Sequence, residues 1–438
     1  MPEAALSPVQ SWGRVGAPAH RLVTPNTIAQ ARAAIAGGGT WLAHGMGRSY
    51  GDVALSAGGT LINTRGLDRF VAFDRESGIL EAEAGVTLEE VIRVALPHRW
   101  FLPTTPGTRY VSLGGAVAND VHGKNHHRAG TFGCWVHSLE LARSDGSLQT
   151  CQPEVNTDMF RATIGGLGMT GLITRVTLQL VQVPGAFLDS EDVAFGSLDE
   201  FFELTSRDDA AGWEHTVAWL DCAGARAGRG IFSRANWSQD ADREMRLDGF
   251  KPRVPVDAPS FLLNRFSVRA FNELYFRVKA ARARRARIHF SACFYPLDGI
   301  LHWNRLYGPS GFYQYQCVVP LPVQADAMAA LLREIVRSGQ ASSLAVIKQF
   351  GVRTSPGLLS FPMPGTHIAL DFPNRGAATH GLFERLDAIV AAAGGRLYPA
   401  KDGRMPAALF RSGYPDWIGV SGLKDPHVRS DFWQRVAR

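Results

Sequence analysis

The chain has 438 residues, of which 45% are hydrophobic and 20% charged, and its formal net charge is +6. This composition is ordinary for a globular enzyme and excludes long disordered regions, and the length suggests about two or three domains. A mildly basic balance suits an anionic ligand or a membrane surface, and we expect no nucleic-acid partner. The five scattered cysteines form no C-x-x-C pair, so neither a zinc site nor a disulfide framework is indicated.

The N-terminal residues lack a basic stretch followed by an apolar one, so we expect no signal peptide. No apolar run is long enough to predict a transmembrane segment. We therefore expect a cytoplasmic or peripherally membrane-associated protein in a reducing compartment.

The first part of the chain predicts a glycine-rich loop at the end of a strand. Residues 24–27 precede an Ala/Ile-rich segment that stops at three glycines, which predicts a short capped helix. A buried strand over residues 40–44 then leads into residues 45–52, at a position where phosphate-binding turns tend to lie. Further short strands are predicted over 61–64, 70–73 and 79–84, followed by a capping box at 87–90 and a helix ended by Pro97.

The segment 106–131 combines five glycines, three histidines and a lysine. Gly107, Gly114 and Gly115 allow the backbone to approach a ligand closely. A short helical turn is predicted after the Gly pair, with free N–H groups that could face an anion such as pyrophosphate. A glycine-rich surface loop with solvated histidines is the weaker alternative, given this density.

The middle of the chain contains a misleading motif. Residues 166–171 spell G-x-G-x-x-G, but the alternating residues that follow predict a strand over 172–183 and no helix. The dinucleotide-binding interpretation therefore fails. Elsewhere the patterns predict a hairpin over 136–151 and a domain boundary at 183–185. Beyond that boundary they predict helices over 197–204 and 383–393 and strands over 215–222, 290–295, 313–319, 344–350 and 368–372. We also expect an irregular segment over 251–259, an extended segment over 396–401 and a short polar tail after residue 426.

A run of basic residues lies beside aromatic ones at positions 271–287. It contains Arg277, Lys279, Arg282, Arg284, Arg285 and Arg287. One interpretation is a solvated helix face; the other is contact with an anionic lipid surface or a lipid phosphate.

The two glycine-rich segments together resemble those of the vanillyl-alcohol-oxidase type of FAD-linked oxidoreductases. Within that group the chain most resembles the decaprenylphosphoryl-β-D-ribose 2′-oxidases. The resemblance rests on D-V-H-G-K-N-H-H (120–127), Y-G-P-S-G-F-Y-Q-Y-Q (307–316), L-S-F-P-M-P-G (359–365), D-F-P (371–373) and G-G-R-L-Y-P-A-K-D (394–402). These motifs occur in order over most of the chain, which makes them specific in combination.

The resemblance implies an α+β, two-domain fold of the FAD-binding (PCMH, vanillyl-alcohol-oxidase) type with an antiparallel-sheet substrate domain. The FAD domain would comprise residues 1–180 and 396–438, and the substrate domain residues 181–395. The implied cofactor-binding residues are Ala43, His44, Gly45, Met46, Gly47, Arg48, Ser49, Tyr50, Gly51, Asp52, Gly107, Ser112, Leu113, Gly114, Gly115, Asn119, Asp120, Val121, His122, Ile173 and Tyr398. The implied substrate-binding residues are Lys124, Trp219, Tyr295, Gln314, Gln316, Lys348 and Lys401.

Two positions depart from the resembled pattern. Many relatives attach flavin covalently through a histidine of the first loop, where this chain has Arg48, so we expect non-covalent FAD. The mycobacterial enzymes have a cysteine before D-F-P, where this chain has Ala369, which changes the pocket wall.

Alcohol oxidation by a flavin requires a group that accepts the hydroxyl proton. The candidate catalytic residues are Lys401, His122 and Tyr50. His122 titrates in a suitable range without perturbation, whereas Lys401 would need burial or nearby cations to lower its pKa. A charged Lys401 would instead stabilise negative charge that develops on the flavin. A metal site is not expected, because neighbouring histidines diverge and no carboxylate pair lies nearby.

The leading hypothesis is oxidation of the ribose 2′-hydroxyl of a polyprenyl-phosphoryl-β-D-ribose to the 2-keto sugar. A short-chain-dehydrogenase-type keto-reductase would be the partner that completes epimerisation to the arabinose donor. The alternatives are an alditol or aldonolactone oxidase that uses dioxygen, and a flavin-free lipid-binding or scaffold protein.

Overall fold

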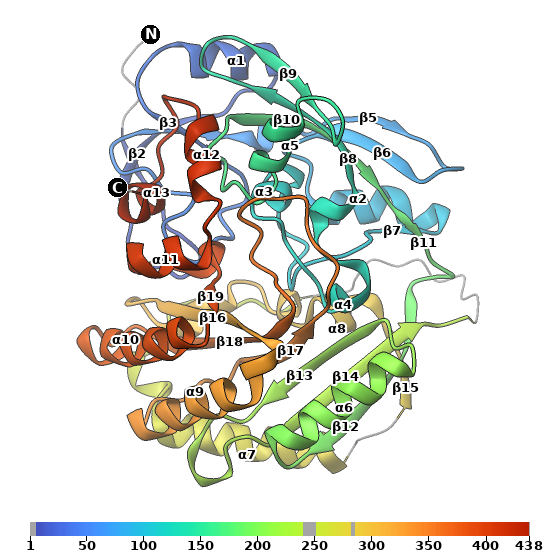
Figure 1. Cartoon of the computed structure of the whole chain (residues 1–438), viewed down its shortest axis with the longest axis vertical. Coiled ribbons are helices and arrows are strands. Elements are labelled where there is room, and N and C mark those ends of the chain that lie inside the picture. The colour runs from blue at the N-terminus through green and yellow to red at the C-terminus, as the bar shows by residue number, and fades with distance from the viewer. Residues whose placement is uncertain (1–5, 240–250, 282–284, 438) are drawn as a thin grey trace.

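The computed structural model describes residues 6–239, 251–281 and 285–437. The chain forms two packed parts, an upper one from both ends of the chain and a lower one from its middle (Figure 1). Within the described residues, no helix has the length and apolar character needed to cross a bilayer.

The upper part contains two main sheets. The first has the order β1 (Ser7–Pro8), β2 (Ala19–Val23), β4 (Thr60–Asn63) and β3 (Trp41–His44), and helix α1 (Ile28–Ala36) connects β2 to β3. The second is antiparallel, with the order β5 (Phe70–Phe73), β6 (Ile79–Glu83), β10 (Leu172–Gln179), β8 (Val136–Ala142) and β9 (Leu148–Cys151).

Short elements complete the upper part. They are α2 (Leu88–Ala95), α3 (Leu113–Ala118), α4 (His126–Ala129), α5 (Thr157–Thr163) and the strand pair β7 (Trp100–Phe101) and β11 (Val181–Gln182). The predicted capping box at the start of α2 is confirmed, since Thr87 and Glu90 each bond the other's backbone N–H.

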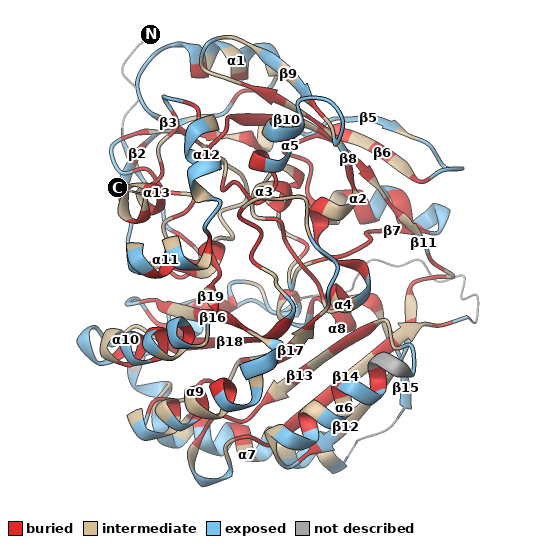
Figure 2. Ribbon diagram, in the orientation of Figure 1, coloured by how far each residue is buried: buried red, intermediate tan, exposed pale blue. Residues whose placement is uncertain are grey.

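The lower part is an eight-stranded antiparallel sheet. Its order is β15 (Arg285–His289), β12 (Phe187–Phe195), β14 (Gly230–Trp237), β13 (His215–Leu220), β17 (Ala345–Phe350), β18 (Gly365–Pro373), β16 (Phe312–Pro320) and β19 (Arg396–Leu397). Helices α6 (Leu198–Ala210), α7 (Arg265–Ala281), α9 (Gln324–Ser338) and α10 (Ala377–Ala392) pack against it, and α7 lies at the lower end of the molecule (Figure 1). Strand β18 is buried along nearly its whole length (Figure 2), as expected for a strand covered on both faces.

After β19 the chain returns to the upper part through the 3₁₀ helix η9 (Pro399–Lys401) and helices α11 (Ala407–Gly413), α12 (Trp417–Leu423) and α13 (Asp431–Val436). In α13, Arg435 Nη2 contacts Asp52 Oδ1 at 2.9 Å and Asp402 Oδ2 at 3.0 Å. The end of the chain thus fixes both the first glycine-rich loop and the returning segment.

The α+β class with antiparallel sheets is confirmed, and most predicted elements are present. The predicted strand over 290–295 is wrong, because α8 (Phe290–Phe294) is a helix. His289 caps it by accepting the N–H of Ser291, and the buried residues Phe290, Cys293 and Phe294 follow helical spacing. A short apolar run does not distinguish the two structures.

Two further expectations need correction. The segment after residue 426 is not merely a polar tail, because α13 buries Phe432 and Trp433. The basic run is not one helix face: Arg277 and Lys279 lie on α7, whereas Arg285 and Arg287 lie on β15. Arg282 and Arg284 fall outside the described residues.

Candidate functional site

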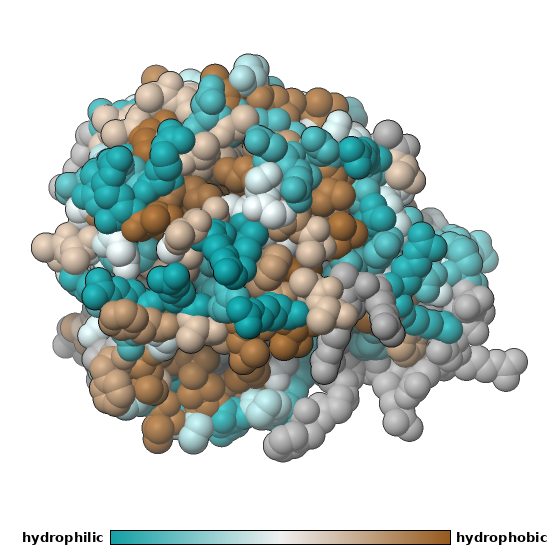
Figure 3. Space-filling view, turned by 90° about the horizontal axis from the view of Figure 1, so that it is seen from below, coloured by the Kyte–Doolittle hydropathy of each residue, from teal (hydrophilic) through white to brown (hydrophobic). Residues whose placement is uncertain are grey.

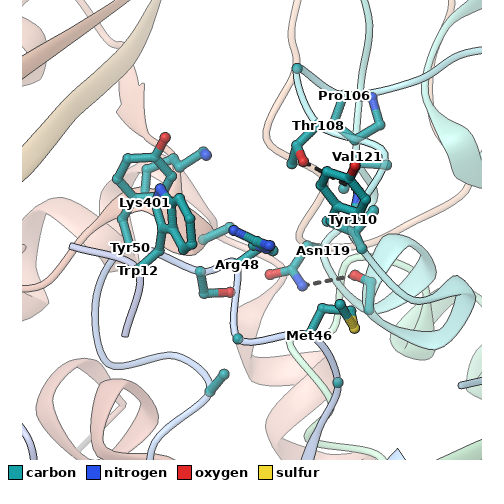
Figure 4. Close-up of a pocket in the computed structure, with 18 of the residues that line it drawn as sticks. Trp12, Met46, Arg48, Tyr50, Pro106, Thr108, Tyr110, Asn119, Val121 and Lys401 are labelled. Carbon is teal, nitrogen blue, oxygen red and sulfur yellow. Dashed lines mark hydrogen bonds between the residues drawn. The ribbon is translucent and has the colours of Figure 1, made fainter. Parts of the chain in front are cut away.

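A cavity of about 380 Å³ lies between the two parts. The two glycine-rich segments form its upper wall, and alternate residues of β16, β17 and β18 form its floor. Residues 297–298 and 300–303 close one side. Figure 4 shows Trp12, Tyr50 and Lys401 on one side of the cavity, and Pro106, Thr108 and Tyr110 on the other.

The first glycine-rich loop fits closely against its neighbours. A Cβ on Gly45 would lie 2.3 Å from Ser112 Oγ, and one on Gly51 would lie 1.6 Å from the backbone oxygen of Asp402. The backbone of Asp402 therefore excludes a side chain at Gly51, whereas a side chain at Gly45 would force the Ser112 hydroxyl to move. The loop is held against the second glycine-rich segment on one side and against the returning chain on the other.

The same loop presents unpaired backbone donors. Gly47 has a φ of +61°, and the N–H groups of Met46, Gly47 and Arg48 have no hydrogen-bond partner in the described part of the chain. Successive N–H groups around a left-handed residue form a concavity that binds anions.

The expectation for the second segment was different and is wrong in one respect. The N–H groups that open α3 are not free, because Leu113 donates to Val86 O at 2.7 Å, Gly114 to Ala84 O at 2.8 Å and Gly115 to Ser112 Oγ at 3.3 Å. These donors are therefore already hydrogen-bonded within the protein and do not face the cavity as free groups. Of the two segments, the first loop is therefore the better anion site.

Most of the cofactor-binding residues predicted from the sequence line the cavity. They are Ala43, Gly45, Met46, Gly47, Arg48, Ser49, Tyr50, Gly107, Ser112, Gly114, Gly115, Asn119, Val121, His122, Ile173 and Tyr398. His44, Gly51, Asp52, Leu113 and Asp120 do not line it. Asp120 is buried and accepts hydrogen bonds from Ser360 Oγ at 2.5 Å and the Gly133 N–H at 2.7 Å, so it supports the wall from behind.

Arg48 occupies the middle of the upper wall. Its guanidinium lies 4.0 Å from the centre of the Trp12 ring and 5.6 Å from that of Tyr110. Figure 4 shows it extending between these aromatic residues toward Asn119. A cation stacked in this way contributes charge and a flat surface to the cavity.

At one end of the floor, Lys401 and Gln314 line the cavity and contact Tyr50 of the first glycine-rich loop and Asp371, which lies outside the lining. Lys401 Nζ lies 3.7 Å from the centre of the Tyr50 ring, and Gln314 Nε2 donates to Asp371 Oδ1 at 2.5 Å. Burial lowers the pKa of Lys401 to about 7 and raises that of Asp371 to about 7. Burial also raises the pKa of Tyr50 well above its usual value, so Tyr50 is a neutral phenol at physiological pH.

The other end of the floor contains a lysine and histidines. Burial lowers the pKa of Lys348 to about 7, and Lys348 Nζ donates to Gly123 O at 3.1 Å. Burial, with Lys348 nearby, lowers the pKa of His122 well below its usual value. The His122 and Gln316 side chains meet at 3.4 Å between their Nε2 atoms. His122 is therefore neutral, and a weaker base than an unperturbed histidine.

Three predicted substrate-binding residues lie behind the cavity wall. Lys124 Nζ donates to Cys293 O at 2.5 Å, Trp219 Nε1 donates to Ser343 O at 3.0 Å, and Tyr295 shares a hydrogen bond of 2.6 Å with Thr105. None of the three lines the cavity, whereas Gln314, Gln316, Lys348 and Lys401 do.

The sequence reasoning missed His367, which lines the cavity and is 2% exposed. Neither of its ring nitrogens has a hydrogen-bond partner on another described residue. Strand periodicity could have identified it, because His367 precedes the wall residue Ala369 by two positions on β18 and faces the same side. Trp12 and Trp303, which also line the cavity, carry no comparable signal.

Clusters of three or more His, Cys, Asp or Glu residues suited to a metal ion are absent from the described part of the chain. The five cysteines are free thiols. The polar side chains that line the cavity floor are lysines, amides and histidines.

Comparison with known proteins identifies that cofactor. Residues 19–152 match the family model of an FAD binding domain. The chain is 36% identical to the decaprenylphosphoryl-beta-D-ribose oxidase of Mycolicibacterium smegmatis, over 95% of this chain and 94% of that protein. It is 33% identical to an uncharacterized protein of Streptomyces coelicolor, over 78% of this chain and 96% of the relative. A putative D-arabinono-1,4-lactone oxidase of Neurospora crassa is 27% identical over 37% of this chain and 29% of its own length.

The residues present fit FAD. The N–H groups of Met46, Gly47 and Arg48 offer an anion site for a pyrophosphate. Gly45 leaves room where a side chain would collide with Ser112. The cavity also continues from this loop to the polar floor, as a cofactor with an anionic and an aromatic end requires. The chain therefore belongs to the decaprenylphosphoryl-β-D-ribose oxidase family and is an FAD-dependent oxidoreductase.

Proposed function

We propose that this enzyme oxidises the ribose 2′-hydroxyl of a polyprenyl-phosphoryl-β-D-ribose to the 2-keto sugar. The observation that carries the proposal is the polar floor, where Lys401, Gln314 and Lys348 face the FAD-binding wall. The similarity to a decaprenylphosphoryl ribose oxidase over nearly the whole chain supports the choice of substrate.

FAD supplies the oxidising power, because its isoalloxazine ring accepts a hydride from the carbon that bears the hydroxyl group. In this proposal neutral Lys401 accepts the hydroxyl proton. A pKa of about 7 leaves roughly half of its amine neutral at neutral pH. His122 suits this task less well, because its strongly lowered pKa makes it a weak base.

The remaining floor residues orient the sugar. Gln316 lines the cavity and has amide groups that can both donate to and accept from a hydroxyl group. Gln314 is fixed by Asp371, and its amide is therefore preorganised. Preorganised donors reduce the ordering that the reaction itself requires.

The chemistry of the product implies a following step. Ribose and arabinose differ only in configuration at C2, so a ketone at C2 reduced from the opposite face yields arabinose. A separate keto-reductase of the short-chain-dehydrogenase type would supply that second hydride. This oxidation would then be the first half of an epimerisation.

The decisive experiment is anaerobic flavin reduction across a panel of sugars. We expect a short-chain prenyl-phosphoryl ribose to bleach the flavin, with free alditols and aldonolactones at least about a hundredfold slower. The partial similarity to a putative arabinono-lactone oxidase supplies the rival. Faster bleaching by an aldonolactone would establish that rival and reject the proposal.

A further inference from the structure

The outward face of α7 carries apolar side chains that the rest of the described chain leaves uncovered. Phe266 is 69% exposed, Leu274 64% and Val278 40%. Phe266, Ala270, Leu274 and Val278 follow one another at intervals of four residues, so they form one row along the helix. The lower end of the molecule, where α7 lies, shows apolar side chains gathered in a patch (Figure 3).

The patch extends beyond the helix. Phe261 is 72% exposed and Leu262 49%, in the 3₁₀ helix η5 (Ser260–Leu262) directly before α7. Phe271 is also exposed and stacks on Tyr275 with ring centres 5.9 Å apart. Contiguous exposed apolar side chains of this number are unusual on a soluble protein and mark an interaction surface.

Arginines border the apolar row. Arg265, Arg269 and Arg277 are exposed and precede Phe266, Ala270 and Val278 by one position each, so they form a parallel row. The acidic residue of that row, Glu273, is paired with Arg277 at 2.6 Å and with Arg229 at 2.6 Å. The edge of the patch is therefore cationic.

The patch adjoins the side of the cavity that residues 297–298 and 300–303 form. Leu263, between η5 and α7, packs in an aromatic cluster with Tyr50 and Trp303, both of which line the cavity. Ile300 also lines the cavity and is itself 41% exposed. The backbone oxygen of Leu301, the next residue, accepts the N–H of Val254. This bond places Val256, which is 70% exposed, close to the same side of the cavity.

We propose that η5 and the outward face of α7 form a docking surface for an anionic lipid bilayer. An apolar row beside an arginine row is the pattern of helices that lie in a membrane interface. The apolar side chains enter the boundary between head groups and acyl chains, and the arginine head groups remain among the lipid phosphates. The net charge of +6 also favours attraction to an anionic surface.

This surface would hold that side of the cavity at the bilayer. If the proposed function is correct, a prenyl chain could remain in the membrane while its sugar enters the cavity. Lipid binding itself does not depend on that substrate, so the two proposals can fail separately.

The test is co-sedimentation of the FAD-loaded enzyme with vesicles that contain about one third phosphatidylglycerol. The test variants are Phe266→Gln with Leu274→Gln, and Arg269→Gln with Arg277→Gln. We expect the first pair to weaken vesicle binding at least about tenfold, because two apolar side chains lose their burial. We expect each arginine substitution to weaken vesicle binding by about fivefold, with the largest loss at low salt.

Matched controls lie elsewhere on the surface. Ile418→Gln on α12 removes an apolar side chain that is 67% exposed, and Arg93→Gln on α2 removes an exposed charge. Both should bind vesicles as the parent does, and all variants should retain flavin and melting temperature. Unchanged binding by the Phe266/Leu274 variant would overturn the proposal. A parent dimer in sizing experiments that this variant abolishes, without vesicle binding, would assign the patch to a second copy instead.

Discussion

The ammonium nitrogen of Lys401 lies 3.7 Å from the centre of the Tyr50 ring, which joins the returning C-terminal segment to the first glycine-rich loop. The amine is thus held at one place in the cavity by an aromatic face. Its low pKa, about 7, follows from that buried position and makes both protonation states accessible under physiological conditions.

We expect Lys401→Ala to slow flavin reduction by substrate about a hundredfold or more, as loss of one preorganised catalytic group does. Lys401→Arg should rescue little, since a guanidinium does not lose its proton near neutral pH. Lys279→Ala, a lysine on α7 paired with Asp192, is the control. Single-turnover bleaching of FAD-saturated proteins measures the effect, and a parental rate in Lys401→Ala would remove this residue from the mechanism.

The pH dependence tests the form in which Lys401 acts. With a pKa of about 7, the neutral amine rises from about a tenth of the molecules at pH 6 to about nine tenths at pH 8. The rate of flavin reduction should therefore rise with pH through about 7. Lys401→Ala should lose the part of this rise that Lys401 causes, whereas Lys348 and Asp371, whose pKa values are also about 7, still titrate. A rate that falls over the same range would identify the ammonium as the active form.

FAD should be held without a covalent bond. Arg48 stands where related flavoproteins carry a linking histidine, and its guanidinium lies on the Trp12 ring, so it offers no nucleophile. Acid precipitation should release all the yellow colour into the supernatant. Flavin that stays with the precipitated protein would contradict this expectation.

Gly51→Ala should destabilise the enzyme, because its Cβ would lie 1.6 Å from the backbone oxygen of Asp402. Overpacking of this kind costs about 1–3 kcal/mol or more, since the backbone must move. Gly107→Ala is the matched control, because Gly107 lies in the other glycine-rich segment and its Cβ would meet nothing within 4 Å. Thermal unfolding should separate the two, and equal melting temperatures would show that the loop yields freely.

His367→Phe should affect stability and substrate binding in opposite directions. A buried histidine without a partner for either ring nitrogen is costly, so phenylalanine should raise the melting temperature of the substrate-free enzyme. We propose that His367, which lines the cavity, hydrogen-bonds a sugar hydroxyl, and losing that bond should raise KM by about tenfold. An unchanged KM with a higher melting temperature would leave His367 as a wall residue only.

The parts of the fold that were predictable are those with strong local signals. Thr87 and Glu90 define the start of α2 by their own chemistry, and the alternation after Gly171 is sufficient to identify β10. The segment at Phe290 lacked such a signal, because an apolar run of six residues fits a strand and a helix alike. The segment forms helix α8, whose first turn is capped by His289, which accepts the N–H of Ser291.

The candidate site, like the fold, was predictable only where the sequence carries a strong local signal. Motifs located the glycine loops and Lys401, but they did not distinguish a residue that lines the cavity from one behind it. Lys124 and Tyr295 were expected in the pocket, yet their polar atoms bond Cys293 O and Thr105. That difference depends on the packing of distant segments, which a single sequence does not display.

The pairing of Arg435 with Asp52 and Asp402 has a consequence for biosynthesis. The loop that receives the cofactor is complete only when residues nearly four hundred positions later have been made. A nascent chain on the ribosome would therefore carry an unclamped loop until Arg435 has been made and has reached Asp52, and stable cofactor uptake should follow that contact. Contacts between such distant positions also slow folding, because a long loop must close before they form.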